Sequence, residues 1–122
     1  MLIDQCFLME RQERRLDAKK ICFITCVNNE ELYAEALLYL KHLHMPEGMQ
    51  AEYVGVRGAA SMAAGYNEGM RKSDAKYRVY LHQDTLVVNK DLAADLLRLF
   101  ADASIGAVGV IGCRSLPRSG VW

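Results

Sequence analysis

Residues 21–30 read Ile21-Cys22-Phe23-Ile24-Thr25-Cys26-Val27-Asn28-Asn29-Glu30. Residues 21–27 are almost all apolar or β-branched, which is typical of a strand buried on both faces in a parallel sheet. The stretch then turns polar at Asn28 and Asn29, where an asparagine is a good helix N-cap, and Glu30 suits the first turn of a helix. The sequence therefore predicts a buried strand that leads directly into a helix.

Strand and helix patterns alternate along the rest of the chain. Their periodicity predicts helices over 31–44, 62–72 and 91–102, and strands over 51–56, 77–82 and 105–112. Strands that alternate with helices of this length form βαβ units with right-handed crossovers. We therefore predict an α/β fold in which a mostly parallel sheet is flanked by helices.

The N-terminal segment has a different pattern. Its apolar residues lie ahead of a charged run from Glu10 to Arg15, which is the reverse of the order in a signal peptide. We expect an amphipathic helix over 1–20 that docks on the domain or on a partner, followed by one α/β domain over 21–122. No closing helix follows the last turn before Trp122, so we expect this domain to be truncated at its C-terminus.

Composition limits the class of protein. The chain has 122 residues, 52% of them hydrophobic, which suits one globular domain. Its 15 basic and 15 acidic residues balance, so no basic face for nucleic acid is expected. No apolar run reaches the roughly 18 residues of a transmembrane helix. The four cysteines are Cys6, Cys22, Cys26 and Cys113. They lack Cys-x-x-Cys spacing and nearby histidines, so we expect no zinc site. We expect buried free thiols instead, in a cytoplasmic protein.

The strand expected over 77–82 runs into a His-x-Asp pair. Strand side chains repeat every second residue, so we expect His82 and Asp84 to point the same way. Ligands of α/β sheets bind at the carboxyl ends of the strands. Asp84, with His82 beside it, is therefore the best candidate for holding a divalent metal against a phosphate-bearing ligand. The alternative is a polar exit from the strand without chemistry.

These motifs occur in the order found in a known family. From Ile21 to Trp122 the chain resembles the nucleotide-binding half of family 2 glycosyltransferases, which have a GT-A, Rossmann-like fold, and more closely their StrF-like, "glycosyltransferase-like" subgroup. The similarity rests on five segments: the strand 21–27 with its Asn-Glu exit, Gly65-Tyr66-Asn67-Glu68-Gly69 in place of an Arg-Asn-x-Gly segment, 79–85 in place of a hydrophobic run with Asp-x-Asp, the strand 105–112, and Gly120-Val121-Trp122. Each segment is weak alone, and their order carries the resemblance.

The resemblance implies a donor and a metal. Its members bind a nucleoside-diphosphate sugar, here expected to be of the UDP type, through Mn²⁺ or Mg²⁺ that bridges the diphosphate. Asp84 is the carboxylate that would contact the metal. His82 replaces the first Asp of the motif, which leaves three roles open: a preference for Mn²⁺, a direct phosphate contact, or weakened metal binding.

The resemblance also assigns the nucleotide contacts, which are Val27, Asn28, Asn29, Glu30, Arg57, Ser61, Asn67 and Gln83. Asn28, Asn29 and Glu30 either line the base and ribose pocket or cap the helix that follows. Arg57 stands where the family usually has an acidic residue. Both a phosphate contact and a solvent-facing side chain remain open for it.

No catalytic residue is identified. The family's general base follows the last segment present here, and Asp91, Asp95 and Asp102 fit a solvated helix face instead. The leading hypothesis is the donor-binding half of an inverting glycosyltransferase whose acceptor is unknown. The alternative is a non-catalytic nucleotide- or protein-binding module, which would assemble, also as a homo-oligomer, through its N-terminal helix or open sheet edge.

Overall fold

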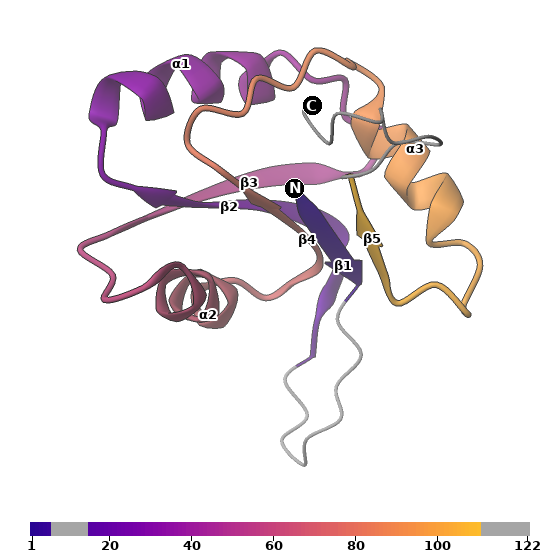
Figure 1. The fold of residues 1–122 in the computed structure, drawn as a ribbon. Helices are drawn as coiled ribbons and strands as arrows, with labels where there is room; N and C mark the ends of the chain where they lie inside the picture. Colours follow the sequence, from indigo (N-terminus) through magenta and orange to yellow (C-terminus); the bar gives the residue numbers. More distant parts are fainter. Residues whose placement is uncertain (6–14, 111–122) are drawn as a thin grey trace, which may run out of the picture.

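The computed structural model describes residues 1–5 and 15–110, which form a five-stranded sheet with helices on both faces (Figure 1). In chain order the elements are β1 (Leu2–Gln5), β2 (Asp17–Val27), α1 (Glu30–Lys41), β3 (Gln50–Arg57), α2 (Met62–Lys72), β4 (Ala75–Leu81), α3 (Leu92–Leu99) and β5 (Ala107–Gly109). The strand order is β3-β2-β4-β1-β5. β2 is parallel to β3 and β4, whereas β1 is antiparallel to β4 and β5. The predicted α/β class with a mostly parallel, Rossmann-like core is confirmed.

The two faces of the sheet pack against different helices, as Figure 1 shows. One face packs against α1 and α3, and its buried core includes Ile21, Phe23, Val79, Leu81, Leu40 and Leu96. The other face packs against α2 through Cys22, Ile24 and Tyr80, with Tyr66 of α2 against them. β2 and β4 are therefore buried on both sides, which explains the continuous apolar sequence of these two strands.

Two buried glycines bring α2 close to β2. Gly65 and Gly69 lie one turn apart on the same side of the helix. A Cβ atom at Gly65 would overlap Cys26 Sγ, and one at Gly69 would overlap Ile24 Cγ2. The Gly-Tyr-Asn-Glu-Gly segment therefore has a packing role, because it seats α2 directly on the sheet.

The predicted N-terminal helix is wrong where the structure describes it. Leu2–Gln5 is strand β1, inserted between β4 and β5, and residues 17–20 belong to β2. Ile3 is only 1% exposed, because the insertion places it in the core on the α1 and α3 side. Pairing with two strands outweighs the local helical spacing of the apolar residues. Residues 6–14 lie outside the described part of the chain.

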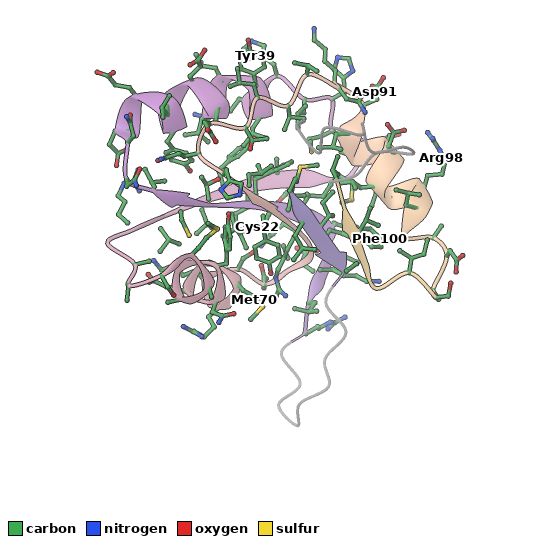
Figure 2. The ribbon with its side chains drawn as sticks, viewed as in Figure 1. Cys22, Tyr39, Met70, Asp91, Arg98 and Phe100 are labelled. Atoms are coloured by element: carbon green, nitrogen blue, oxygen red, sulfur yellow. The ribbon has the colours of Figure 1, made fainter. Side chains whose placement is uncertain are left out.

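The two described cysteines are free thiols, as predicted. Cys22 is fully buried, and Figure 2 shows it in the interior, whereas Arg98 projects outward from α3. Cys26 is only half-buried. Cys6 and Cys113 lie outside the described residues. Of the strand predicted over 105–112, β5 covers 107–109, residues 105, 106 and 110 are not in a strand, and residues 111 and 112 lie outside the described part of the chain. In the described ranges, no helix is long and apolar enough to cross a membrane.

Candidate functional site at the carboxyl ends of the parallel strands

The parallel strands β2, β3 and β4 end at the same edge of the sheet. Val27 and Arg57 lie opposite each other at the ends of β2 and β3, and Leu81 ends β4 opposite Thr25. From β2 the chain passes through α1 to β3 on one side, and then through α2 to β4 on the other side. The boundary between β2 and β4 is therefore a topological switch point, the place where α/β sheets bind ligands.

Gln83 connects the two sides of this switch point. Its Oε1 atom accepts hydrogen bonds from the backbone nitrogens of Asn28 and Asn29, at 3.0 and 2.9 Å. Its Nε2 atom donates to Oδ1 of Asn28. The structure thus brings together three residues that the resemblance assigned to the nucleotide, and it fixes the loop after β4 against the start of α1.

Asn29 is the N-cap of α1. Its Oδ1 atom accepts hydrogen bonds from the backbone nitrogens of Glu31 and Leu32, both at 3.1 Å. The capping role predicted for this Asn-Asn pair is confirmed at Asn29. A nucleotide contact by the same residue stays a prediction.

Arg57 pairs with Glu30 across the ends of β3 and α1. The guanidinium donates through both Nε and Nη2 to the two carboxylate oxygens, with an Nη2–Oε2 distance of 2.9 Å. It also lies over the Tyr33 ring, 5.6 Å from its centroid. The hydrogen bond from Arg57 lowers the pKa of Glu30 and raises that of Arg57. A phosphate at Arg57 must therefore compete with a bidentate carboxylate.

A crevice of about 300 Å³ lies beside this edge, over the ends of β2 and β3 and the start of α2. Its lining residues are Cys26, Val27, Asn28, Val56, Gly58, Ala59, Ser61 and Met62. Ser61 caps α2 by accepting a hydrogen bond from the Ala64 nitrogen at 3.1 Å. Gly58 has φ +68°, which permits the sharp turn between β3 and α2. Three predicted nucleotide residues, Val27, Asn28 and Ser61, share this crevice.

His82 and Asp84 lie in a turn and not on the strand. β4 ends at Leu81, and the Thr85 nitrogen donates to the His82 carbonyl at 3.1 Å. The prediction that strand alternation aims both side chains the same way is therefore wrong, because the alternation stops before the pair. His82 lines a groove on the α2 side together with Asn67, and Asp84 is not among the described residues of that lining. Both members of the pair are exposed.

The donor set around the pair suits a metal that a ligand brings with it. The described residues contain no group of three or more His, Cys, Asp or Glu side chains able to hold a metal. A Mg²⁺ ion bound with a nucleotide takes only one or two protein carboxylates, and phosphates and water complete its shell. The exposed carboxylate of Asp84 fits that mode of binding. It does not form a preformed metal cage.

The three carboxylates on or beside α3 make local contacts. Asp91 lies 3.0 Å from His44 Nδ1, and Asp95 accepts a hydrogen bond from Asn89 Nδ2 at 2.9 Å. Asp102 accepts hydrogen bonds from the nitrogen and hydroxyl of Ser104. These contacts agree with the surface role expected for the three acids.

A comparison with protein families matches the α/β part of the chain. The model of a family described as "Glycosyltransferase like family" matches residues 22–122, from β2 to the end of the chain. The chain belongs to this glycosyltransferase-like family. Comparison with the curated proteins and with the solved structures gives no match. The family-2 resemblance is thereby supported at the level of a sugar transferase-like domain, and the StrF-like subgroup stays a prediction.

The features described above lie within the residues that the family model matches. The switch point, the crevice and the His82–Asp84 turn all lie at this edge of the sheet. Two features of this region were not predicted from the sequence: the bridging role of Gln83, and the aromatic pair of Tyr66 and Tyr80 beside His82. The only sequence signal for the first was a long amide side chain between two candidate metal ligands.

Proposed function

We propose that the chain is the donor-binding part of a nucleotide-sugar glycosyltransferase. In this proposal a nucleoside diphosphate, of the UDP type, lies in the crevice over β2 and β3 and extends its phosphates across the switch point to Asp84. The observation that carries the proposal is the Gln83 bridge, which holds the Asp84 turn against the strand end that lines the crevice.

Each residue then has a definable task. Val27, Asn28 and Ser61 line the space for the nucleoside, and Asp84 would hold a Mn²⁺ or Mg²⁺ ion. When bound, such an ion would supply charge neutralisation for the departing diphosphate. Glu30 and Arg57 hold the ends of α1 and β3 together at the rim. His82 stands in place of a metal-binding Asp, but its side chain lines the groove on the α2 side, so Asp84 is the metal-binding residue of this proposal.

The transfer itself is a displacement at the anomeric carbon of the donor sugar. The acceptor hydroxyl oxygen bonds to the anomeric carbon while the bond between that carbon and the diphosphate oxygen breaks. The diphosphate leaves with the electron pair of that bond, and the hydroxyl proton passes to a carboxylate base. The described residues do not include an assigned base, so turnover is proposed for the transferase to which this domain contributes.

Calorimetry with uridine diphosphate tests the proposal. We expect binding that is tighter with Mn²⁺ than with a metal chelator, and an Asp84→Ala variant should lose that difference. Glu35→Ala removes an exposed carboxylate from α1, away from the crevice lining, and should keep it. Equal affinity with and without Mn²⁺, or an Asp84→Ala variant that behaves like Glu35→Ala, contradicts the metal role of Asp84.

The alternative function, a non-catalytic assembly module, was expected to use an N-terminal helix or an open sheet edge. Leu2–Gln5 is an interior strand of the sheet and does not form the N-terminal helix that this module was expected to use. The family match favours the transferase-like function.

A further inference from the structure

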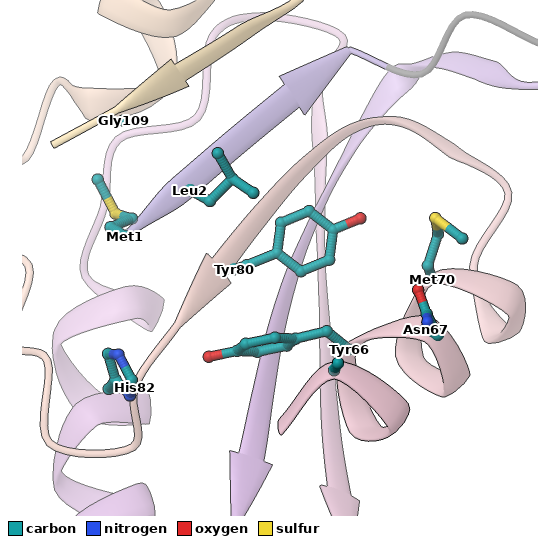
Figure 3. Close-up of a pocket in the computed structure, with 9 residues that line it drawn as sticks. Met1, Leu2, Tyr66, Asn67, Met70, Tyr80, His82 and Gly109 are labelled. Atoms are coloured by element: carbon teal, nitrogen blue, oxygen red, sulfur yellow. The ribbon is translucent and has the colours of Figure 1, made fainter. Parts of the chain in front are cut away.

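A second cavity lies on the other flank of α2. This groove, of about 530 Å³, lies between α2, the end of β4 and the start of β1. Figure 3 shows His82 at one end and Met70 at the other, with Leu2, Tyr66 and Tyr80 between them. Its volume falls within the range of about 300–1,000 Å³ that small-molecule pockets occupy.

The aromatic surface at the centre of the groove consists of Tyr66, which is half-buried, and Tyr80, which is only 7% exposed. The rings of Tyr66 and Tyr80 meet edge to face, with centroids 5.4 Å apart and planes at 76°. The Tyr66 hydroxyl donates a hydrogen bond to the Leu81 carbonyl at 2.9 Å, which prevents that ring from turning away. Leu2 is 50% exposed and adds an aliphatic side to the same surface. Such a surface is preorganised for a flat apolar group.

The groove offers little to an anion. None of the described side chains that line it comes from Asp, Glu, Lys or Arg. Apart from the terminal amino group of Met1, a nucleoside diphosphate would find no countercharge there to offset its lost hydration. The Asn67 amide and the His82 imidazole are the polar side chains of the groove besides the two tyrosine hydroxyls, and they suit hydrogen bonds to a neutral ligand.

We propose that this groove binds the acceptor, and that the acceptor carries a flat, uncharged apolar group. This inference rests on the proposed donor function. Neighbouring residues at the start of α2 face different cavities, since Met62 lines the crevice and Ala63 lines the groove. A donor whose diphosphate reaches Asp84 brings its sugar to the His82 end of the groove, where the acceptor hydroxyl is needed.

Equilibrium dialysis with two naphthalene probes tests this assignment. We expect 2-naphthol, a flat neutral alcohol, to bind the full chain, and naphthalene-2-sulfonate to bind about tenfold more weakly or worse. Ala63→Trp fills the groove from an exposed helix position and should weaken 2-naphthol binding by about tenfold or more. Ala34→Trp places the same side chain on exposed α1, outside the groove lining, and should leave binding unchanged.

Three results overturn the assignment: no binding of 2-naphthol, equal binding of both probes, or equal effects of the two tryptophan variants. Uridine diphosphate affinity, measured on the same variants, separates this inference from the donor proposal. Ala63→Trp should retain it, because the crevice lies on the other flank of α2. If 2-naphthol binding fails while uridine diphosphate still binds, only the acceptor groove is wrong. If uridine diphosphate does not bind, the acceptor role falls with the donor proposal, even where 2-naphthol binds.

Discussion

Gln83 and Asn28 are joined by two hydrogen bonds across the switch point of the sheet: Gln83 Oε1 accepts from the Asn28 nitrogen at 3.0 Å, and Gln83 Nε2 donates to Asn28 Oδ1. Two bonds between the same pair of residues fix orientation as well as distance. Gln83 lies between His82 and Asp84 in the sequence, so the pair sets where that turn sits relative to β2.

Replacing Gln83 should therefore affect both stability and ligand binding. Gln83→Ala leaves the nitrogens of Asn28 and Asn29 without their protein acceptor, and we expect a loss of about 1–2 kcal/mol in the free energy of unfolding. Gln83→Glu keeps an acceptor for both nitrogens and should cost less. Urea unfolding gives the free energies, and calorimetry should show weaker uridine diphosphate binding by Gln83→Ala. Equal stability of the alanine and glutamate variants contradicts the bridging role.

Gly69 should resist substitution by alanine. The gain in helix propensity is about 1 kcal/mol, but overpacking against Ile24 costs about 1–3 kcal/mol, so we expect a net loss of stability. The loss should shrink in an Ile24→Ala background, where the Cγ2 atom in the way is missing. Gly109→Ala is the matched control, since a Cβ there meets no described atom within 4 Å. Additive effects of the Gly69 and Ile24 changes in thermal unfolding contradict the close packing.

Cys22 should be unreactive in the folded protein. Burial raises the pKa of its thiol to about 11, and the reactive thiolate is therefore scarce at neutral pH. We expect iodoacetamide to modify Cys22 at pH 8 only after denaturant is added, and Cys26, which is half-buried, to react sooner. Peptide mass spectrometry resolves the two positions. Rapid native labelling of Cys22 would falsify its burial.

The Glu30–Arg57 pair should account for part of the loss of thermal stability at acidic pH. Arg57 lowers the pKa of Glu30 below its ordinary value of 4.5, so the folded state holds this carboxylate charged to lower pH than the unfolded state does. The resulting stabilisation is complete above the unfolded pKa and is lost as the pH falls through the folded one. Tm measured from pH 7 to pH 3 should therefore fall less steeply for Glu30→Gln than for the wild type. Glu35→Gln, elsewhere on α1, should follow the wild type, and an unchanged profile for Glu30→Gln counts against the pair.

Local sequence signals were enough to predict the parallel core. The apolar run 21–27, the asparagine that caps α1 and the polar exits of the strands each depend on neighbouring residues, and the structure confirms them. β1 was missed because its partners are distant in sequence: Ile3 lies opposite Val79 on one side and Val108 on the other. No window of neighbouring residues contains that information.

The candidate site was predicted less completely, for the same physical reason. The edge of the sheet was correctly located, because it follows from where the parallel strands end. The contacts within it join residues from separate elements, as Gln83 joins Asn28 and Arg57 joins Glu30. The prediction from strand alternation at His82 and Asp84 was wrong because the strand ends at Leu81, one residue earlier than its apolar pattern suggests.

The position of β1 also bears on the order of assembly. Strands β2, β3 and β4 follow one another through single helices, so each finds its neighbour soon after it is synthesised. β1 leaves the ribosome before them, yet its partners are residues 77–80 and 107–109. Contacts between such distant segments form slowly, because a large loop must close first. β1 is therefore expected to join the sheet after β2, β3 and β4, although it is synthesised before them, and until then the edge of β4 stays open to other chains.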